Sequence, residues 1–426
     1  MRALVFGAPP SPGEWRPEPG DDVGKALASL PFGLHTVEDA RMLGPDWVLT
    51  RPRLSGICGS DAKLVLGDFG EGDIDNPMSA FSSLPHVPGH EVVADVVEVG
   101  PAARHVEVGQ RVVLNPWLTC APRGVDPPCP ACVAGDLSLC WSFTAGKLGP
   151  GVHVGVTTDA PGAWADLLAA HDSMLIPVPA GVPDELAVLA DPFAVSLHAI
   201  LRHPPPPGGR AVVYGAGALG VTAVAALRCL FPDVEVAVVA RFAAQERFAT
   251  HLGASVVVAH EPRLAVVEEL ARWSGAVLHA PLDGLPLAHP GHIDVVYDTV
   301  AKPETFEVGV RVLAERGTLV QTGVATPGRW EWTPVYFKEL TLAGSNAFGM
   351  EDIGGVRRHA IAHYLDLTAA GRIDLTGMLT HRFPLERWWD ALRVLADQEA
   401  SGAIKVAFEP GARPDPVVST SGAPGG

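Results

Sequence analysis

Three short segments carry side chains that together could bind a catalytic metal ion. Cys58 lies in the sequence Gly-Ile-Cys-Gly-Ser-Asp, His90 and Glu91 follow a glycine, and Asp191 begins the sequence Asp-Pro-Phe. Taken singly, each has a simpler interpretation, such as a small buried thiol or a hydrogen-bonded loop histidine. Together, a thiolate, an imidazole and a carboxylate suit a zinc ion with three protein ligands and one open position. That open position polarises a bound alcohol or carbonyl oxygen.

Four of the six cysteines form a second candidate metal site. They lie within 21 positions, at Cys120, Cys129, Cys132 and Cys140. A tight cluster in a chain with few cysteines indicates metal binding in a reducing compartment rather than a disulfide framework. Four thiolates suit a closed, tetrahedral structural zinc, and a lobe without metal is the alternative. A nucleic-acid-binding zinc module is disfavoured because no basic and aromatic surface accompanies the cysteines.

A glycine-rich turn indicates a dinucleotide site. Gly215, Gly217 and Gly220 follow the apolar run Arg-Ala-Val-Val-Tyr and open a helical pattern. In that context the glycines permit a tight turn, close approach of the backbone to a pyrophosphate, and close contact between helix and strand. The start of the helix then faces the anion. A glycine turn used only for packing is the alternative.

The end of the next expected strand bears on which dinucleotide binds. About twenty residues after the third glycine, sheets specific for NAD place an Asp or Glu on the adenosine ribose. This chain has Ala240 and Arg241 there. Without a carboxylate a 2′-phosphate is not repelled, and a guanidinium can bind it through paired charge-assisted hydrogen bonds. NADP is therefore expected, with NAD as the alternative in which Arg241 is only a solvated cation.

The elements that must position these residues fall into two groups. The first 180 residues are rich in glycine, proline and short β-like runs, which predicts an irregular β-rich domain. A helix is expected from Pro183 to Arg202, before a block of prolines and glycines. Beyond it, strands and helices alternate, which predicts an α/β unit with a parallel sheet wrapped by helices. Its strands are expected at 211–214, 234–239, 255–259, 293–297 and 318–322.

Helices are expected between these strands and again in the last part of the chain. One begins at Ala218, one covers 245–252, and two run through Ala271 and Ala314. After residue 345, an apolar face from Val356 to Leu365 predicts a helix that ends at Gly371, and a second ends near Gly402. A strand at 403–408 follows.

Length and composition exclude several classes of protein. The 426 residues suffice for two or three domains, and 47% are hydrophobic, which is typical of a globular protein. The net charge of −17 disfavours nucleic acid and anionic membranes as partners. The first residues predict a strand rather than a secretion signal, and the longest uncharged run contains the glycine-rich turn, so a cytoplasmic protein is expected.

These motifs, in this order, resemble the zinc-dependent medium-chain dehydrogenase/reductase family, which includes the alcohol, sorbitol and threonine dehydrogenases. The segment Phe-Lys-Glu-Leu-Thr-Leu-Ala-Gly-Ser at 337–345 belongs to the same resemblance, which extends from the first strand to about Phe408. The resemblance implies an α/β fold with two domains. A GroES-like, β-rich catalytic domain would comprise 1–192 and 346–410, and a doubly wound Rossmann domain 193–345. The tail at 411–426 is expected to be disordered.

The resemblance also implies roles for the residues of the first motif set. Cys58 and His90 match the zinc ligands, and Glu91 matches a ligand that can exchange with water. Asp191 matches the acidic third-ligand position of the threonine and sorbitol branches. Ser60 matches the hydroxyl that removes the proton of the substrate alcohol. Hydride would then pass from the carbinol carbon to the nicotinamide.

Three departures from the family pattern accompany the resemblance. Asp61 matches the family, at a residue that supports the zinc site. Lys63 stands where the family often has a proton-conducting histidine. Either the pKa of this lysine is lowered or water takes the role of the histidine. The stretch between Ser60 and His90 is longer than usual and either lines the substrate cleft or is a surface insertion. The first structural cysteine of the family falls at Asp126, so the first ligand is either Asp126 or Cys120, with Cys120 preferred.

Two other functions compete with that of a zinc-dependent alcohol oxidoreductase. A zinc-independent quinone or enone reductase of the same superfamily would lack the ligands at Cys58 and His90, which are present. A non-catalytic dinucleotide-sensing protein would keep the fold without turnover. The expected partner is a small-molecule substrate, either an alcohol or the corresponding ketone or aldehyde. A polyol and an amino alcohol are the candidate classes of alcohol. The resemblance implies a homodimer or homotetramer joined through the nucleotide-binding sheets.

Overall fold

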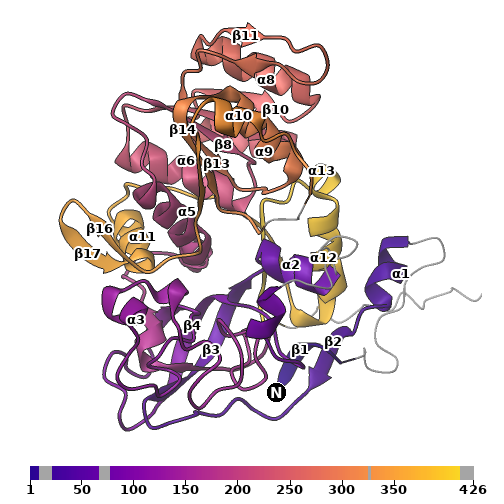
Figure 1. Ribbon diagram of the computed structural model, residues 1–426. Helices are drawn as coiled ribbons and strands as arrows, with labels where there is room; N and C mark the ends of the chain where they lie inside the picture. Colours follow the sequence, from indigo (N-terminus) through magenta and orange to yellow (C-terminus); the bar gives the residue numbers. More distant parts are fainter. Residues whose placement is uncertain (9–21, 67–76, 325–327, 413–426) are drawn as a thin grey trace, which may run out of the picture.

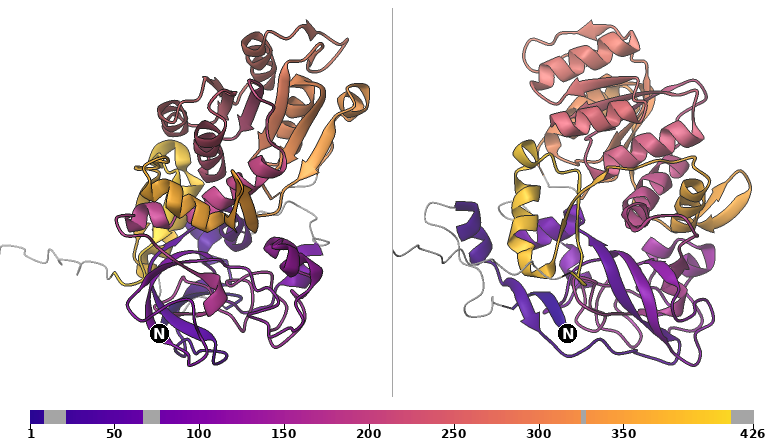
Figure 2. Two further views of the ribbon diagram at one scale, coloured as in Figure 1. Left: turned by 90° about the vertical axis from the view of Figure 1, so that its left-hand side faces the viewer. Right: turned by 180° about the vertical axis from the view of Figure 1, so that it is seen from behind.

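Two sheets of different kinds organise the protein. The computed structural model describes residues 1–8, 22–66, 77–324 and 328–412 (Figure 1). One sheet is mainly antiparallel and is built from both ends of the chain, and the other is parallel and is built from its middle. The views in Figure 2 place the parallel sheet and its helices at one end of the molecule and the β-rich part at the other. The expected two-domain α/β fold is confirmed. The domain boundaries at 192 and 345 stay predictions.

The first sheet has the strand order β18-β19-β3-β4-β5-β7, and β6 pairs with β3. All its pairs are antiparallel except that of β18 with β19. A separate antiparallel pair, β1 (Arg2–Phe6) and β2 (Phe32–Thr36), packs beside it. The strands of the first sheet are β3 (Trp47–Gly56), β4 (Glu91–Val99), β5 (Arg111–Leu114), β6 (Leu168–His171), β7 (Leu175–Pro177), β18 (Leu379–Phe383) and β19 (Lys405–Phe408).

Short helices and one further hairpin surround this sheet. The hairpin consists of β16 (Met350–Ile353) and β17 (Val356–His359). The helices in the N-terminal part are α1 (Asp22–Ala28), α2 (Gly59–Leu66), η2 (Pro77–Phe81), α3 (Pro130–Ala134), η3 (Leu137–Leu139), η4 (Asp172–Met174) and α4 (Asp184–Ala187). Those in the C-terminal part are α11 (Ala360–Ala369), η5 (Leu385–Arg387), α12 (Trp388–Ala396) and α13 (Gln398–Ser401).

The second sheet has the order β10-β9-β8-β13-β14-β15, and every pair in it is parallel. Its strands are β8 (Arg210–Tyr214), β9 (Glu235–Ala240), β10 (Val256–Ala259), β13 (Ile293–Asp298), β14 (Leu313–Gln321) and β15 (Thr341–Gly344). The helices are α5 (Ala190–Arg202), α6 (Ala218–Leu230), α7 (Ala243–His251), α8 (Arg263–Ser274), α9 (Pro303–Val312) and α10 (Thr333–Phe337). A small pair, β11 (Leu278–His279) and β12 (Leu287–Ala288), lies outside it.

Both faces of the parallel sheet are buried, which explains its continuous apolar strands. In β8, Ala211 and Val213 belong to the core cluster that includes α5 and α6, whereas Val212 and Tyr214 belong to the cluster that includes α8 and α9. Helices therefore cover both sides of the sheet, as the alternation of strands and helices predicted.

Three helix predictions are wrong in detail, and the causes are local. The helix expected from Pro183 to Arg202 is interrupted, because Pro192 has no N–H to donate and is accommodated in the first turn of a new helix, α5. The helix expected from Val356 instead begins at Ala360. Val356 is in β17, directly after a Gly-Gly turn whose two residues both have positive φ, as tight hairpins require. The helix expected through Ala314 also ends at Val312, where β14 begins.

Candidate catalytic and structural metal centres

Strand pairing brings Cys58, His90 and Glu91 together. In the antiparallel pair of β3 and β4, Gly56 is opposite Glu91. Cys58 follows β3 by two residues, and His90 directly precedes β4. One ligand atom from each of the three side chains lies within 4.8 Å of the others. A thiol, an imidazole and a carboxylate at this spacing fit the donor preferences of zinc.

Asp61, in the first turn of α2, holds two of these residues in place. Its Oδ2 accepts a hydrogen bond of 3.2 Å from the backbone N–H of Cys58, and its Oδ1 lies 3.3 Å from Nδ1 of His90. Burial alone would raise the pKa of Asp61, but the adjacent His90 lowers it below the usual value. Burial likewise opposes a charge on His90, yet Asp61 and Cys58 raise the His90 pKa. The supporting role implied for Asp61 is consistent with these contacts.

A buried lysine, which the sequence analysis missed, neutralises Glu91. Lys405 of β19 forms an ion pair with Glu91 and donates a 3.0 Å hydrogen bond to the carbonyl oxygen of Ile57. Both charged side chains are at most 2% exposed. The lack of a side chain at Gly56 is required here, because a Cβ atom at that position would collide with Oε2 of Glu91. Lys405 therefore gives the buried Glu91 carboxyl group a partner of opposite charge in a region closed to water.

Asp191 lies near this centre but outside the three-residue group. It is in the first turn of α5 and is buried. Burial raises its pKa to about 7, opposed by His90 and reinforced by Glu91. At this centre, the described residues whose ligand atoms all lie within 4.8 Å of one another are Cys58, His90 and Glu91, and Asp191 is not among them. A ligand role for Asp191 stays a prediction.

Helix α2, which begins one residue after Cys58, carries Ser60 and contacts the parallel-sheet domain through Lys63. Ser60 is partly exposed in the first turn of this helix. One turn later, Nζ of Lys63 donates a 2.8 Å hydrogen bond to the carbonyl oxygen of Val324, which follows β14. The helix thus connects the two domains beside Cys58. The long stretch before His90 lies partly outside the described residues, at 67–76.

A second residue missed from the sequence, His153, packs on the candidate centre. Its ring centroid is 4.6 Å from that of His90, and the ring of Trp117 meets it edge-on at 5.7 Å. Burial, with a further contribution from His90, lowers the pKa of His153 to about 3. No spacing rule could have indicated it, because the chain returns to this position only after the cysteine-rich segment.

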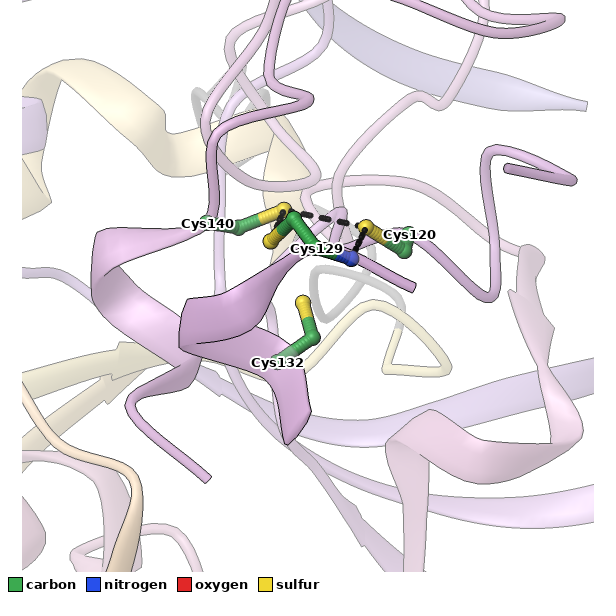
Figure 3. A group of neighbouring side chains, drawn as sticks. All are labelled: Cys120, Cys129, Cys132 and Cys140. Carbon is green, nitrogen blue, oxygen red and sulfur yellow. Dashed lines mark hydrogen bonds between the residues drawn. The ribbon is translucent and has the colours of Figure 1, made fainter. Parts of the chain in front are cut away.

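The four clustered cysteines converge as the sequence predicted (Figure 3). One sulfur atom from each lies within 4.8 Å of the others, and all six cysteines are free of disulfides. The chain folds back so that Cys120, rather than Asp126, completes the group. Backbone N–H groups of Cys129, Trp141 and Ser142 donate to sulfur atoms of the cluster, an arrangement that suits thiolates. Four sulfur donors fit a closed tetrahedral zinc site.

Arg123 connects the loops that carry this cluster. Its side chain is fully buried and lacks a carboxylate partner among the hydrogen bonds and ion pairs of the described residues. The guanidinium instead donates to five carbonyl oxygens, those of Leu118, Ala145, Leu148, Gly149 and Gly151, at 2.6–3.0 Å. The lobe is therefore held by side-chain contacts more than by regular secondary structure.

The glycine-rich turn has the geometry of a phosphate-binding loop. Gly215 has a φ of +97°, and a Cβ atom on Gly220 would collide with the carbonyl oxygen of Gly215. A Cβ atom on Gly217, which precedes α6, would meet nothing within 4 Å. The open space beside Gly217 could hold a ligand at the start of the helix. Arg241 is exposed just after β9, with its guanidinium 5.0 Å from the ring centroid of Phe242.

Two family models match the chain over these same elements. The model "Alcohol dehydrogenase GroES-like domain" matches residues 44–180, and the model "Zinc-binding dehydrogenase" matches residues 217–362. The chain belongs to the zinc-dependent medium-chain dehydrogenase/reductase family. It is an alcohol dehydrogenase-like oxidoreductase, and a zinc ion and a nicotinamide cofactor belong to this family's chemistry.

Family members of known name are similar over most of their length. L-galactonate-5-dehydrogenase of Escherichia coli (strain K12) is 28% identical over 343 residues, which are 80% of this chain and 85% of that protein. (R,R)-butanediol dehydrogenase of Saccharomyces cerevisiae is 28% identical over 382 residues, 83% of this chain and 89% of that protein.

Solved structures of dehydrogenases share the fold. Galactitol-1-phosphate dehydrogenase from Escherichia coli superposes with a TM-score of 0.70 at 18% identity, covering 96% of this chain and all of the other. A zinc-binding dehydrogenase from Sinorhizobium meliloti bound to NADP gives a TM-score of 0.66 at 24% identity, covering 90% and 97%. Within the described residues of this family member, no helix has the length and apolarity needed to cross a membrane.

Proposed function

We propose that this protein transfers hydride between NADP(H) and a polyol or amino alcohol, or the corresponding carbonyl compound. The observation that supports this most is the group of Cys58, His90 and Glu91 beside α2, the helix that contacts the nucleotide-binding domain through Lys63. The names of the relatives, which refer to galactonate and butanediol, favour a substrate with several hydroxyl groups. A cytoplasmic location is part of the proposal.

The side chains divide the work of the reaction. Cys58 and His90, with Glu91 or Asp191, would hold the catalytic zinc, and Cys120, Cys129, Cys132 and Cys140 the structural one. When bound, the catalytic zinc would lower the pKa of an alcohol, as it lowers that of bound water to about 7, and the nicotinamide would carry the hydride. Ser60 would accept the alcohol proton. Because Lys63 already donates to the Val324 carbonyl, we infer that water completes the path to solvent.

Cofactor choice provides the direct test. The exposed Arg241, at the end of a strand that ends in Ala240, could bind a 2′-phosphate through charged hydrogen bonds. Such bonds contribute about 1.5–3 kcal/mol, so kcat/KM should favour NADP over NAD by roughly 10- to 100-fold. Initial rates of alcohol oxidation with each cofactor, over a panel of secondary alcohols, polyols and β-hydroxy amino acids, measure this ratio.

Variants of the same two residues sharpen the test. Ala240→Asp combined with Arg241→Gln should reverse the preference, because the new carboxylate would accept from the ribose hydroxyls and repel the phosphate. Arg263→Gln, at an exposed arginine that pairs with Glu307 elsewhere in the same domain, is the matched control and should leave the ratio unchanged. Equal or better use of NAD by the native protein would contradict the NADP assignment.

A further inference from the structure

Arg123 is a buried arginine whose five N–H groups all donate to backbone carbonyl oxygens. It lies between Cys120 and Cys129, the interval in which the cysteine spacing departs from the family pattern. Nε donates one hydrogen bond, and Nη1 and Nη2 donate two each. Every donor of the guanidinium is therefore used. Because this group is planar and rigid, it holds the five carbonyl groups in one fixed arrangement.

Two of these hydrogen bonds join the segments that carry Trp117 and His153. Nε donates to the carbonyl oxygen of Leu118 at 2.9 Å, and Nη2 donates to that of Gly151 at 2.6 Å. The backbones of Trp117 and His153 are paired in an isolated antiparallel bridge. Leu118 follows the first of these residues and Gly151 precedes the second, so both bonds lie at the same end of the bridge. Arg123 therefore fixes the spacing of the two segments.

The bridge places the ring of His153 against a candidate metal ligand. The ring centroids of His153 and His90 are 4.6 Å apart, and Trp117 meets the His153 ring edge-on at 5.7 Å. Trp117 is buried and packs in turn against Phe143, at 5.9 Å between ring centroids. Nδ1 of His153 donates to the carbonyl oxygen of Val154 at 2.6 Å, which orients the ring. Close packing on this side restricts the orientation of the His90 imidazole.

We propose that Arg123 is a positioning residue for the catalytic centre. It acts from the cysteine lobe, through the bridge of Trp117 and His153, and keeps the His90 ring in the orientation that suits a metal ion. The lobe has little regular secondary structure, so the guanidinium provides connections that strand pairing provides elsewhere in the domain. The inference rests on the proposed function for its kinetic test and is independent of it for its spectroscopic test.

Cadmium NMR tests the positions of the ligands without turnover. Protein loaded with cadmium ions should give two signals, because the chemical shift depends on the number of sulfur ligands. Arg123→Lys keeps the charge but has three N–H groups, so at least two carbonyl oxygens lose their donor. It should shift or broaden the signal of the Cys58 centre. Arg311→Lys should leave that signal unchanged, and it is the matched control because Arg311 is a buried arginine of the other domain that donates to the Leu285 carbonyl oxygen.

The step from His153 to the centre is tested by a second variant. His153→Ala leaves all five hydrogen bonds of Arg123 available and removes the ring that packs on His90. It should shift or broaden the same cadmium signal. This result is required even if Arg123→Lys folds poorly, so an unchanged signal in His153→Ala would by itself contradict the inference.

A double-mutant cycle tests whether Arg123 acts through His153. The values of kcat and KM for alcohol oxidation are measured with NADP for the native protein, Arg123→Lys, His153→Ala and the double variant. Each single variant should lower kcat about 10-fold, the lower end of the effect of residues that support metal ligands. The KM for NADP should be unchanged, because the nucleotide site is in the other domain. The double variant should lose little more than either single variant, since both changes disturb the same contact.

Two further results would overturn the inference. One is a cadmium signal of the Cys58 centre that is the same in Arg123→Lys as in the native protein although Tm falls, which would limit Arg123 to stabilising the lobe. The other is a double variant whose loss of kcat is the product of the two single losses, because Arg123 would then act independently of His153. A native protein that oxidises no alcohol would contradict the proposed function, whereas the cadmium comparison would still decide this inference.

Discussion

At the scale of single residues, the candidate catalytic centre depends on charges that balance inside a dry region. Glu91 is 1% exposed and is paired with Lys405, which is 2% exposed. Removing one partner of a buried pair leaves an uncompensated charge, whereas replacing both is often neutral. The main effect of the pair is therefore that each partner compensates the burial of the other, rather than a large net contribution to stability.

A double-mutant cycle tests this account. Lys405→Met should lower the free energy of unfolding by about 3–5 kcal/mol, because it leaves Glu91 buried without a partner. Lys405→Met combined with Glu91→Gln should recover most of that loss, since no unpaired charge remains. Denaturant unfolding of the native protein, the two single variants and the double variant gives the free energy of unfolding of each. Zinc content is measured for the same four proteins. A double variant as unstable as Lys405→Met alone would show that Lys405 acts through packing instead.

The contrast between predicted and missed residues has a physical reason. Cys58, His90 and Glu91 were predicted because each lies in a short motif whose residue types already indicate a ligand. Lys405 and His153 reach the same centre only through strand pairing and loop folding between distant parts of the chain. Neither the residue type nor its spacing from a motif indicates in the sequence that these two residues lie at the centre. Their position there follows only from the three-dimensional structure.

At the scale of elements, local sequence signals predicted most of the parallel sheet. Strands such as β8 and the start of α6 at Ala218 agree with the expectation to within a residue, because apolar runs and a glycine turn define them locally. The exceptions occur where a proline or a pair of glycines changes the backbone conformation within an apolar pattern. Pro192 restarts a helix, and Gly354 and Gly355 form a hairpin turn instead of allowing a helix to begin.

The cysteine lobe is an element whose stability should depend on its metal. Its regular structure is limited to the short helices α3 and η3, and three backbone N–H groups donate to sulfur atoms of the cluster. A structural zinc contributes folding free energy directly. Loss of one ligand should therefore destabilise the protein without changing the catalytic residues.

Cys132→Ser is the corresponding prediction. It should remove one zinc ion per chain and lower Tm by roughly 5–10 °C, since each kcal/mol corresponds to about 2–4 °C in domains of 150–250 residues. Cys229→Ser is the matched control, because Cys229 is a free cysteine outside the cluster, and it should change neither quantity. Elemental analysis and thermal unfolding measure the two effects. Full zinc content in Cys132→Ser would contradict the four-thiolate assignment.

At the scale of the whole molecule, the negative charge and the two-sheet architecture were predictable from the sequence. The surface through which two copies of the chain could associate was not. Composition gave the net charge of −17, and the alternation of elements gave a parallel sheet. The order of its strands determines which strand lies at the edge, and that order depends on long-range pairing. In the described residues, β15 is an end strand of the parallel sheet, and exposed aromatic side chains of the segment before it lie at Trp332, Tyr336 and Phe337.

An open edge strand beside exposed aromatic groups favours association with a second copy of the chain. We expect a homodimer in which β15 strands of two copies pair, with a mass in solution twice the 44.6 kDa of the chain. Tyr336, 86% exposed, would be buried in that interface, so Tyr336→Lys should shift the protein toward monomer because a buried, unpaired ammonium is unfavourable. Val108→Lys, at an exposed apolar residue of the other domain, is the control and should leave the mass unchanged. Light scattering coupled to size-exclusion chromatography measures these masses, and a native monomer at micromolar concentration would exclude the expected dimer.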